Sequence, residues 1–173
     1  TSDPAILGSA SVKLDKTNEP LSTQGTLSIK DVDNSPAFVA DNHIAGTNGT
    51  LSIDSAGAWT YAANSAFDNL NAGQSVSDTF TVASVDGTTT TVEVMIKGTN
   101  DAAILGTASV ALDETNAPLI ASGKLSISDV DSPETFIAQN NVAGVHGALS
   151  IDTDGAWTYV SKNALDWISE GKS

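Results

Sequence analysis

The 173-residue chain contains no cysteine, few aromatic residues and few basic side chains. The absence of cysteine excludes disulfide bonds and a thiolate zinc site, so the fold must be stabilised by its core or by bound ions. Only 7 lysines and arginines stand against 21 aspartates and glutamates, which gives a formal net charge of -14. This balance argues against nucleic acid and membrane insertion, and it favours a protein that meets cations. A merely solvated acidic surface would have the same composition.

Signals for a membrane span and for catalysis are also missing. No apolar run approaches the length of a transmembrane helix, and no signal peptide is present, as we expect of an internal fragment. The chain has no Gly-x-Ser-x-Gly, phosphate-loop or dinucleotide motif, and His43 and His146 occupy different positions in the repeat described next. A carboxylate pair for glycoside cleavage would need a cleft, and a small domain offers little of one. We therefore expect no enzymatic activity.

The main feature of the sequence is that it repeats itself. Ala5–Gly8 returns as Ala103–Gly106, and Gly57–Tyr61 returns as Gly155–Tyr159, each at an offset of 98 positions (103 minus 5, 155 minus 57). A period of this length suits one whole domain rather than one turn of a solenoid. The sequence therefore indicates two tandem copies of one domain.

The repeat predicts a complete first domain at residues 1–98 and a second domain at residues 99–173. The second copy has no counterpart of Val76–Lys97, so we expect it to be truncated and to lack its last two strands. A sheet without these strands has an unpaired edge and an open core. Two outcomes are open: disorder of this copy, or strand exchange with another chain that completes it.

Apolar and polar residues alternate with a period of two in many short runs, and valine and threonine dominate these runs. Leu51–Asp54 and Ala58–Tyr61 flank a short loop with glycine, and Phe80–Ala83 and Thr91–Ile96 flank a second one, so both pairs predict β-hairpins. Turn residues separate the runs at short intervals. About six or seven short strands per copy indicate an all-β sandwich.

The few aromatic residues fall mainly on expected core positions. Trp59 and Tyr61 share one face of their strand by alternation, and we expect both in the core rather than at a ligand. One stretch departs from the strand pattern. Residues 64–72 predict a short helical turn, capped by the first of them, with Phe67 and Leu70 facing inward.

Several segments, taken in their order and spacing, resemble the VCBS repeat. They are 98–102 at the junction, Ser128–Asp131, Asp152–Tyr159, and Ser77–Val82 followed by Asp86–Gly87. Repeats of this family occur in long runs within giant bacterial repeats-in-toxin (RTX) adhesins that type I secretion exports. The resemblance implies tandem cadherin-like or immunoglobulin-like β-sandwiches, an extracellular location at the bacterial cell surface or in secreted form, and a requirement for calcium.

Oxygen-bearing side chains gather near the junction, and calcium takes six to eight oxygen ligands. The candidate metal ligands are Asp86, Asn100, Asp101, Glu114, Asp129 and Asp131. We expect Asp86 to lie in a hairpin loop that faces the second copy, and Asp129 and Asp131 to point the same way in an extended segment. The set is similar to the interdomain calcium site of cadherins, which has a linker Asn-Asp, a downstream Asp-x-Asp and an early glutamate.

The same aspartates have a purely structural interpretation, because Asp and Asn often cap turns by bonding their own backbone. Asp-Val-Asp before Ser-Pro would then form a turn and bind no ion. Asp152–Gly155 begins like a calcium loop, but the first copy has Asp54–Gly57 there without the second aspartate. A hairpin turn is therefore the better interpretation of that loop.

The first copy departs from the candidate metal site. Lys16 stands where the second copy has Glu114, and Ser2 stands where it has Asn100. We therefore expect weaker ion binding at the start of the chain. The carboxylates there are Asp3, Asp31 and Asp33.

Two functions fit these observations. The first is a structural extender, or stalk, that holds an adhesive domain away from the cell, supports adhesion or biofilm formation and contacts neighbouring repeats of the same polypeptide. A calcium ion shared at the joint would cancel the repulsion between acidic domains and stiffen the linker. The alternative is a binding module that recognises glycan or a protein partner. The scarcity of aromatic residues favours the extender.

Overall fold

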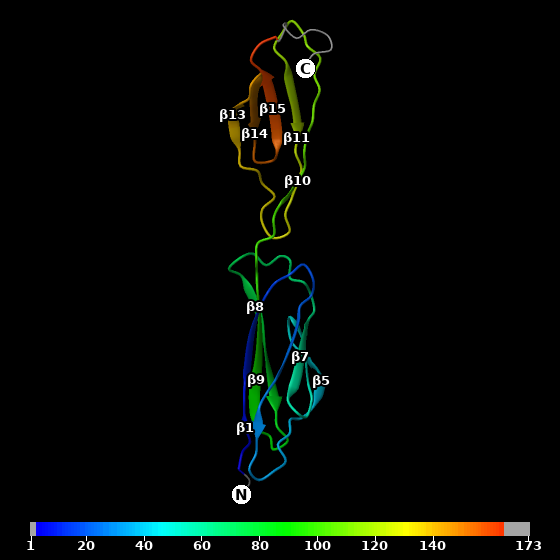
Figure 1. The fold of residues 1–173 in the computed structure, drawn as a ribbon, viewed down its shortest axis with the longest axis vertical. Helices are drawn as coiled ribbons and strands as arrows, with labels where there is room; N and C mark the ends of the chain where they lie inside the picture. The colour runs from blue at the N-terminus through cyan, green and yellow to red at the C-terminus, as the bar shows by residue number, and fades with distance from the viewer. Residues whose placement is uncertain (1–2, 165–173) are drawn as a thin grey trace. The chain divides into compact units, whose positions relative to one another are not determined.

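The computed structural model describes residues 3–164 of the chain. The chain divides into two compact units, Thr1–Asp101 and Ala102–Ser173, which are called unit 1 and unit 2 below. Every regular element of the described part is a β-strand (Figure 1), which confirms the all-β prediction. Residues 3–164 contain no helix long and apolar enough to span a bilayer.

Unit 1 is a sandwich of two main sheets. Its strands are β1 (Ile6–Leu7), β2 (Ala10–Asp15), β3 (Ser22–Thr26), β4 (Ile29–Lys30), β5 (Asp41–Ala45), β6 (Gly49–Ile53), β7 (Ala58–Ala63), β8 (Ser75–Ala83) and β9 (Thr89–Lys97). One sheet has the order β3-β7-β6-β5, the other has the order β2-β9-β8, and β1 pairs with β4. β2 and β9 run parallel, whereas β8 and β9 are antiparallel. Figure 1 shows β8 and β9 facing β7 and β5.

The alternation of side chains explains the pairing. In β6 and β7, Leu51 lies opposite Tyr61 and Ile53 lies opposite Trp59, so the inward residues of both strands meet on one face. The turn between them uses Gly57 at a φ of +86°, a conformation that glycine adopts at little cost. In β8 and β9 buried residues also alternate with more exposed ones. Both predicted hairpins are confirmed.

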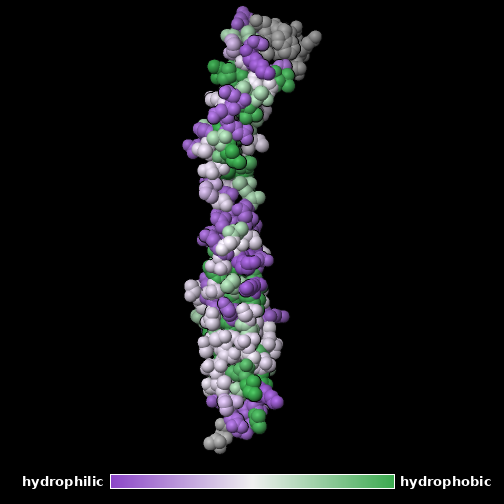
Figure 2. All heavy atoms as spheres, turned by 90° about the vertical axis from the view of Figure 1, so that its left-hand side faces the viewer, coloured by the Kyte–Doolittle hydropathy of each residue, from purple (hydrophilic) through white to green (hydrophobic). Residues whose placement is uncertain are grey.

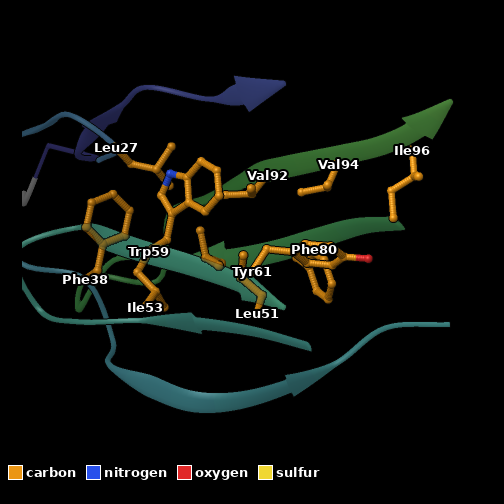
Figure 3. Packing of buried hydrophobic residues seen from close by; sticks show 11 residues of the cluster. Leu27, Phe38, Leu51, Ile53, Trp59, Tyr61, Phe80, Val92, Val94 and Ile96 are labelled. Carbon is orange, nitrogen blue, oxygen red and sulfur yellow. The ribbon is translucent and has the colours of Figure 1, made fainter. Parts of the chain in front are cut away.

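The core of unit 1 lies between the two main sheets (Figure 3). Trp59 is 2% exposed and Tyr61 is 1% exposed, so both are core residues as predicted. The Tyr61 ring packs against Phe80 with centroids 5.9 Å apart and planes at 60°, a tilted arrangement that aromatic pairs favour. The buried cluster contains Leu27, Phe38, Leu51, Ile53, Trp59, Tyr61, Phe80, Val82, Val92, Val94 and Ile96.

The predicted helical turn at residues 64–72 does not form, and the segment consists of bends and turns. Phe67 has a φ of +58°, which is incompatible with a right-handed helix. The Phe67 amide donates to the Ser65 hydroxyl at 3.1 Å, and the Leu70 amide donates to the Phe67 carbonyl at 2.9 Å. The inward orientation is confirmed, since Leu70 is buried and Phe67 packs against the core.

Unit 2 repeats only one of the two main sheets within its described residues. Its strands are β10 (Ile104–Leu105), β11 (Ile120–Lys124), β12 (Ile127–Ser128), β13 (Gln139–Ala143), β14 (Gly147–Ile151) and β15 (Ala156–Ser161). The order β11-β15-β14-β13 matches that of the four-stranded sheet of unit 1, and β10 pairs with β12. In the described part of unit 2 no sheet corresponds to β2-β9-β8. Residues 108–113, at the repeat positions of β2, form no strand.

Candidate metal-binding carboxylates

Asp86 lies in the turn between β8 and β9, and its carboxylate ties that turn to the start of unit 1. Its Oδ2 accepts hydrogen bonds from the Ala5 amide at 2.7 Å and from the Thr88 hydroxyl at 3.0 Å. Its Oδ1 accepts from the Ser84 hydroxyl and from the Thr88 amide, the latter at 3.0 Å. These hydrogen bonds, that of Ser84 above all, hold the pKa of the Asp86 carboxyl well below its ordinary value.

This location corrects one expectation about the metal site. β9 starts just after the Asp86 turn, contains 9 residues and ends at Lys97, immediately before the linker. At roughly 3.3 Å per residue, the strand separates Asp86 by about 30 Å from the end of unit 1 that leads to Asn100 and Asp101. The expectation that Asp86 faces the second copy is therefore wrong, because a hairpin loop lies at the opposite end of the sheet from the outgoing chain.

The Asp129–Asp131 segment is a bend and not the extended segment that we expected. Asp129 Oδ1 accepts hydrogen bonds from the amides of Asp131 at 3.1 Å and Ser132 at 2.8 Å. At the same repeat position in unit 1, Asp31 Oδ1 accepts from two amides of its own loop, both at 2.9 Å. The turn-capping role that the sequence suggested for these aspartates is confirmed. Asp152 likewise caps a hairpin turn, through the amides two and four residues later.

The chain that enters unit 1 passes beside the first Asp-x-Asp loop. The Asp3 amide donates a hydrogen bond to Asp33 Oδ2 at 2.7 Å. Pairing of β1 with β4 brings these two segments together. Unit 2 has the equivalent pairing, with Ile104 opposite Ser128. The residues that precede Ile104 and those that follow Ser128 therefore lie at the same end of unit 2.

Asp101 is ion-paired, inside unit 1, with a lysine whose contact the sequence alone does not reveal. Asp101 Oδ2 lies 2.9 Å from Lys16 Nζ, and the Lys16 side chain is fully buried. The same ammonium donates to the Asp68 carbonyl oxygen at 2.5 Å. Next to it, Asn100 Nδ2 donates to the Asp101 carbonyl at 2.6 Å. The one sequence signal is that Lys16 falls on an inward position after β2, where a charge needs a partner.

The position of Lys16 also bears on Glu114, its counterpart in the repeat. The Lys16 amide donates to the Lys97 carbonyl at 2.8 Å, so this repeat position lies at the outgoing end of unit 1. The Asp-x-Asp loop lies at the incoming end, next to the first residues of the unit. In unit 2 residues 108–113 form no strand, so the repeat alone does not place Glu114 relative to its own Asp-x-Asp loop.

The candidate metal ligands do not converge within one unit. Residues 3–164 contain no group of three or more histidine, aspartate or glutamate side chains placed to hold a metal ion. Glu114, Asp129 and Asp131 are all described residues of unit 2, and they form no such group. The expectation that these three meet at one site is therefore wrong. The remaining ligands, Asn100 and Asp101 together with the Asp129–Asp131 pair, stay a prediction.

A second feature of unit 2 is an apolar groove on the inner face of its sheet. A cavity of about 780 Å³ opens there. Its lining includes Val110, Leu112, Leu149, Trp157 and Tyr159. Their counterparts in unit 1 form one core together with residues of β8 and β9. The groove is therefore the face that the β8–β9 hairpin covers in unit 1.

Comparison with known families shows which family this sandwich belongs to. A family model described as "Bacterial cadherin-like domain" matches residues 2–98, which is more than half of the chain. The chain belongs to the bacterial cadherin-like domain family. Curated proteins gave no match. One similar solved structure, described as "PcdhgB3 EC1-4 in 50 mM HEPES", has 15% sequence identity and a TM-score of 0.47, and the match covers 94% of this chain and 42% of that chain.

Membership of the bacterial cadherin-like family bears on function only in general terms. Cadherin-like domains are typically extracellular, are generally not enzymes and generally bind calcium. They serve adhesion or extension in general. The predicted all-β, cadherin-like fold is confirmed, and the described part of unit 2 repeats one main sheet of the sandwich.

Proposed function

We propose that the chain is a structural extender of a large secreted bacterial surface adhesin, with a calcium ion that rigidifies the joint between its repeats. We assign the repeats to the VCBS type of RTX adhesins, exported by type I secretion and supporting adhesion or biofilm formation. Its partners are then the neighbouring repeats of the same polypeptide. Three observations support the proposal: the cadherin-like family, the tandem repeat and the net charge of -14.

One observation carries the calcium joint. In unit 1 the amide of Asp3 lies 2.7 Å from the carboxylate of Asp33, the second aspartate of its Asp-x-Asp loop. The repeat assigns Asp101 and Asp131 to the same two positions (3 plus 98, 33 plus 98). An entering aspartate beside an Asp-x-Asp loop supplies the carboxylate oxygens that calcium prefers. The proposed ligands are Asn100, Asp101, Asp129 and Asp131.

A metal at this joint has a mechanical purpose. Two acidic domains repel each other, and a short linker without an ion allows them to bend. A divalent ion bound by the linker and the following domain removes repulsion and limits the angles that the joint can adopt. Extracellular calcium modules bind with dissociation constants of about 0.1 to 1 mM, which suits seawater or tissue fluid and leaves the site empty in cytosol.

The test is a calcium titration of the whole chain and two charge-matched variants. Asp131→Asn removes a proposed ligand, and Asp154→Asn makes the same charge change in a hairpin turn of the same unit. At a calcium concentration some 30 times the dissociation constant, we expect about 2 kcal/mol of stabilisation in the wild type. Asp131→Asn should weaken calcium binding about tenfold or more, and Asp154→Asn should leave it unchanged. Calorimetry and thermal melts give both quantities.

Two results would remove calcium from the proposed function. One is a wild-type chain with no heat of binding and no stabilisation at 5 mM calcium. The other is an equal loss of affinity in Asp131→Asn and Asp154→Asn, which would indicate diffuse attraction by the acidic surface. Small-angle scattering with and without calcium tests the extender itself, because the distribution of maximum dimensions should narrow when the ion binds.

A second candidate function rests on the apolar groove of unit 2. We propose that the β8–β9 hairpin of a second copy of this chain occupies the groove. These two strands have the alternation of buried and exposed residues that covers the same face in unit 1. Strand exchange of this kind uses main-chain hydrogen bonds for affinity and alternate side chains for specificity. Light scattering across a concentration series should then show a dimer. A monomer at all concentrations would exclude the exchange.

Glycan recognition has less support. Among the described residues, the exposed large hydrophobic side chains include no aromatic one. On the face of unit 1 that Figure 2 shows, most residues have intermediate hydropathy, and the hydrophobic groups are small. A glycan site usually presents flat aromatic rings, and Trp59, Tyr61 and Trp157 are buried instead. Reproducible binding on a glycan array would overturn the extender proposal in favour of this alternative.

A further inference from the structure

Lys16 is a buried charge at the outgoing end of unit 1. The residue is 4% exposed, and lysine is almost never buried this far unless it is paired. Its Nζ donates to the Asp68 carbonyl at 2.5 Å and to Asp101 Oδ2 at 2.9 Å. One ammonium therefore joins three segments that are distant in sequence: the end of β2, the turn before β8 and the linker.

The atoms around this ammonium are of the kind that bind metal ions. They include a main-chain carbonyl from Asp68 and a carboxylate from Asp101. A further carboxylate oxygen, Asp68 Oδ1, is buried and has no hydrogen-bond partner. Carbonyl and carboxylate oxygens are the ligands of calcium in extracellular modules. At the outgoing end of unit 1 a carbonyl oxygen and a carboxylate oxygen thus bind a positive charge that belongs to the protein.

We propose that Lys16 is a tethered cation that takes the place of a calcium ion at the outgoing end of unit 1 and fastens Asp101 to that unit without metal. The residues there do not fit calcium, because the ammonium is already within hydrogen-bond distance of both acceptors. A divalent ion bound by the same oxygens would be repelled by that ammonium at short range. The inference rests on contacts inside unit 1, and it shares one residue with the calcium joint proposed above, because Asp101 is also a proposed ligand there.

The second copy has the opposite charge at this position, since Glu114 stands where the first copy has Lys16. Glu114 is exposed whereas Lys16 is buried, so water can solvate the glutamate carboxylate. The two copies therefore differ in whether this position holds a buried positive charge. Lys16→Glu should replace the buried ammonium of the first copy with a carboxylate, which then needs an external cation to hold it beside Asp101.

The test uses residue-resolved hydrogen exchange of the whole chain in EDTA and in 5 mM calcium. Three backbone amides report on the outgoing end of unit 1, those of Lys16, Leu70 and Gly98. They donate hydrogen bonds to the carbonyls of Lys97, Phe67 and Gln74, respectively. Their exchange rates in the wild type should agree within twofold in the two buffers. The amides of Asp131 and Ser132, which bond to Asp129, report the proposed calcium joint separately.

Three variants sharpen this test. Lys16→Met keeps the apolar stem and removes the charge, so the three reporter amides should exchange at least tenfold faster in both buffers. In Lys16→Glu the three reporter amides should exchange fast in EDTA and more slowly in calcium, because the calcium ion replaces the missing ammonium. Lys13→Met removes an exposed lysine of β2 and should change none of the three.

Each outcome either supports or overturns the proposed role of Lys16. Calcium protection of the three reporter amides in the wild type would overturn the proposal, since an ion would then bind despite the lysine. Unchanged exchange in Lys16→Met would also overturn it. If circular dichroism shows that Lys16→Glu does not fold, Asp101→Asn takes its place in the test. Asp101→Asn should accelerate exchange of the Gly98 amide as Lys16→Met does. The double variant Lys16→Met, Asp101→Asn should exchange no faster than either single variant. Absence of a calcium effect at Asp131 and Ser132 would contradict only the calcium joint.

Discussion

Units 1 and 2 share a four-stranded sheet but differ in what covers it. Leu51 of unit 1 is 0% exposed, whereas Leu149 at the same repeat position is 37% exposed. Tyr61 is fully buried, and Tyr159 is only half-buried. The strands that carry these residues are closely similar, since β6 and β14 differ at one position and Ala-Trp-Thr-Tyr opens both β7 and β15. The difference in burial therefore comes from the second sheet. Burial in this fold is therefore a property of the pair of sheets and cannot be assigned to one of them.

The two units also differ, among their described residues, in how one loop is held. In unit 1 Asp78, on β8, accepts hydrogen bonds from the amides of Thr47 and Asn48 at 2.9 Å each. In unit 2 the equivalent loop is held by Lys162, whose Nζ donates to the carbonyls of Gly144 and Val145 at 3.0 and 3.2 Å. The β8–β9 hairpin thus supplies unit 1 with a polar anchor as well as apolar cover. In unit 2 the lysine that follows β15 binds carbonyls of this loop, and not the amides that Asp78 binds in unit 1.

The largest expected effect comes from giving unit 2 a hairpin. Ser173 aligns with Ser75, so residues 76–97 appended after Ser173 would extend the second copy in register with the first. Covering a large apolar side chain stabilises by about 1.5 to 3 kcal/mol, and several line the groove, so unit 2 should gain at least about 3 kcal/mol. Hydrogen exchange of β14 and β15 and loss of binding of a hydrophobic dye measure the change.

The control for this graft is the same appended segment with aspartate at the positions of Phe80 and Val92. These two side chains are 3% and 0% exposed in unit 1, so a charged replacement should prevent docking. Equal protection of β14 by both segments would show that unit 2 is not completed as unit 1 is. The two units would then differ in more than their cover.

A smaller effect is expected at high pH from Tyr61, whose hydroxyl donates to Asp78 Oδ2 at 3.4 Å. Burial, and then the charge of Asp78, raise the pKa of Tyr61 to about 12. The unfolded chain loses this proton at its ordinary pKa near 10, so the free energy of unfolding should fall as pH rises from about 10 to 12. Denaturant melts at several pH values measure the slope, which should be shallower in Tyr61→Phe. Equal slopes would contradict the assignment.

The comparison of the two copies also shows how far the sequence alone can lead. Alternation and turn residues are local signals, and they predicted both hairpins and the burial of Trp59 and Tyr61. The helical turn failed because the pattern around Phe67 cannot reveal a positive φ. The pattern indicates which face of a strand is buried, but not what covers that face.

The candidate metal site failed in part for a topological reason. Which end of a sandwich a loop occupies depends on the direction of every strand, and Asp86 was placed at the wrong end for that reason. The pair of Lys16 and Asp101 joins residues 85 positions apart, and no local pattern connects them. Only the inward position of Lys16 in the alternation indicated that a buried charge needed a partner.

The smallest effect is expected from Asp86, because its carboxylate is exposed and water competes for its hydrogen bonds. Its pKa lies below the ordinary value, so its contribution is present near neutral pH and is lost as pH falls through the acidic range. Asp86→Asn should lower the melting temperature of unit 1 slightly at pH 7, and this loss should shrink as the pH falls toward 2. The amide of Ala5 should exchange faster in the variant, since Asp86 is its acceptor. An equal loss at both pH values would indicate that packing of the turn, and not its charge, ties β8 and β9 to the entering strand.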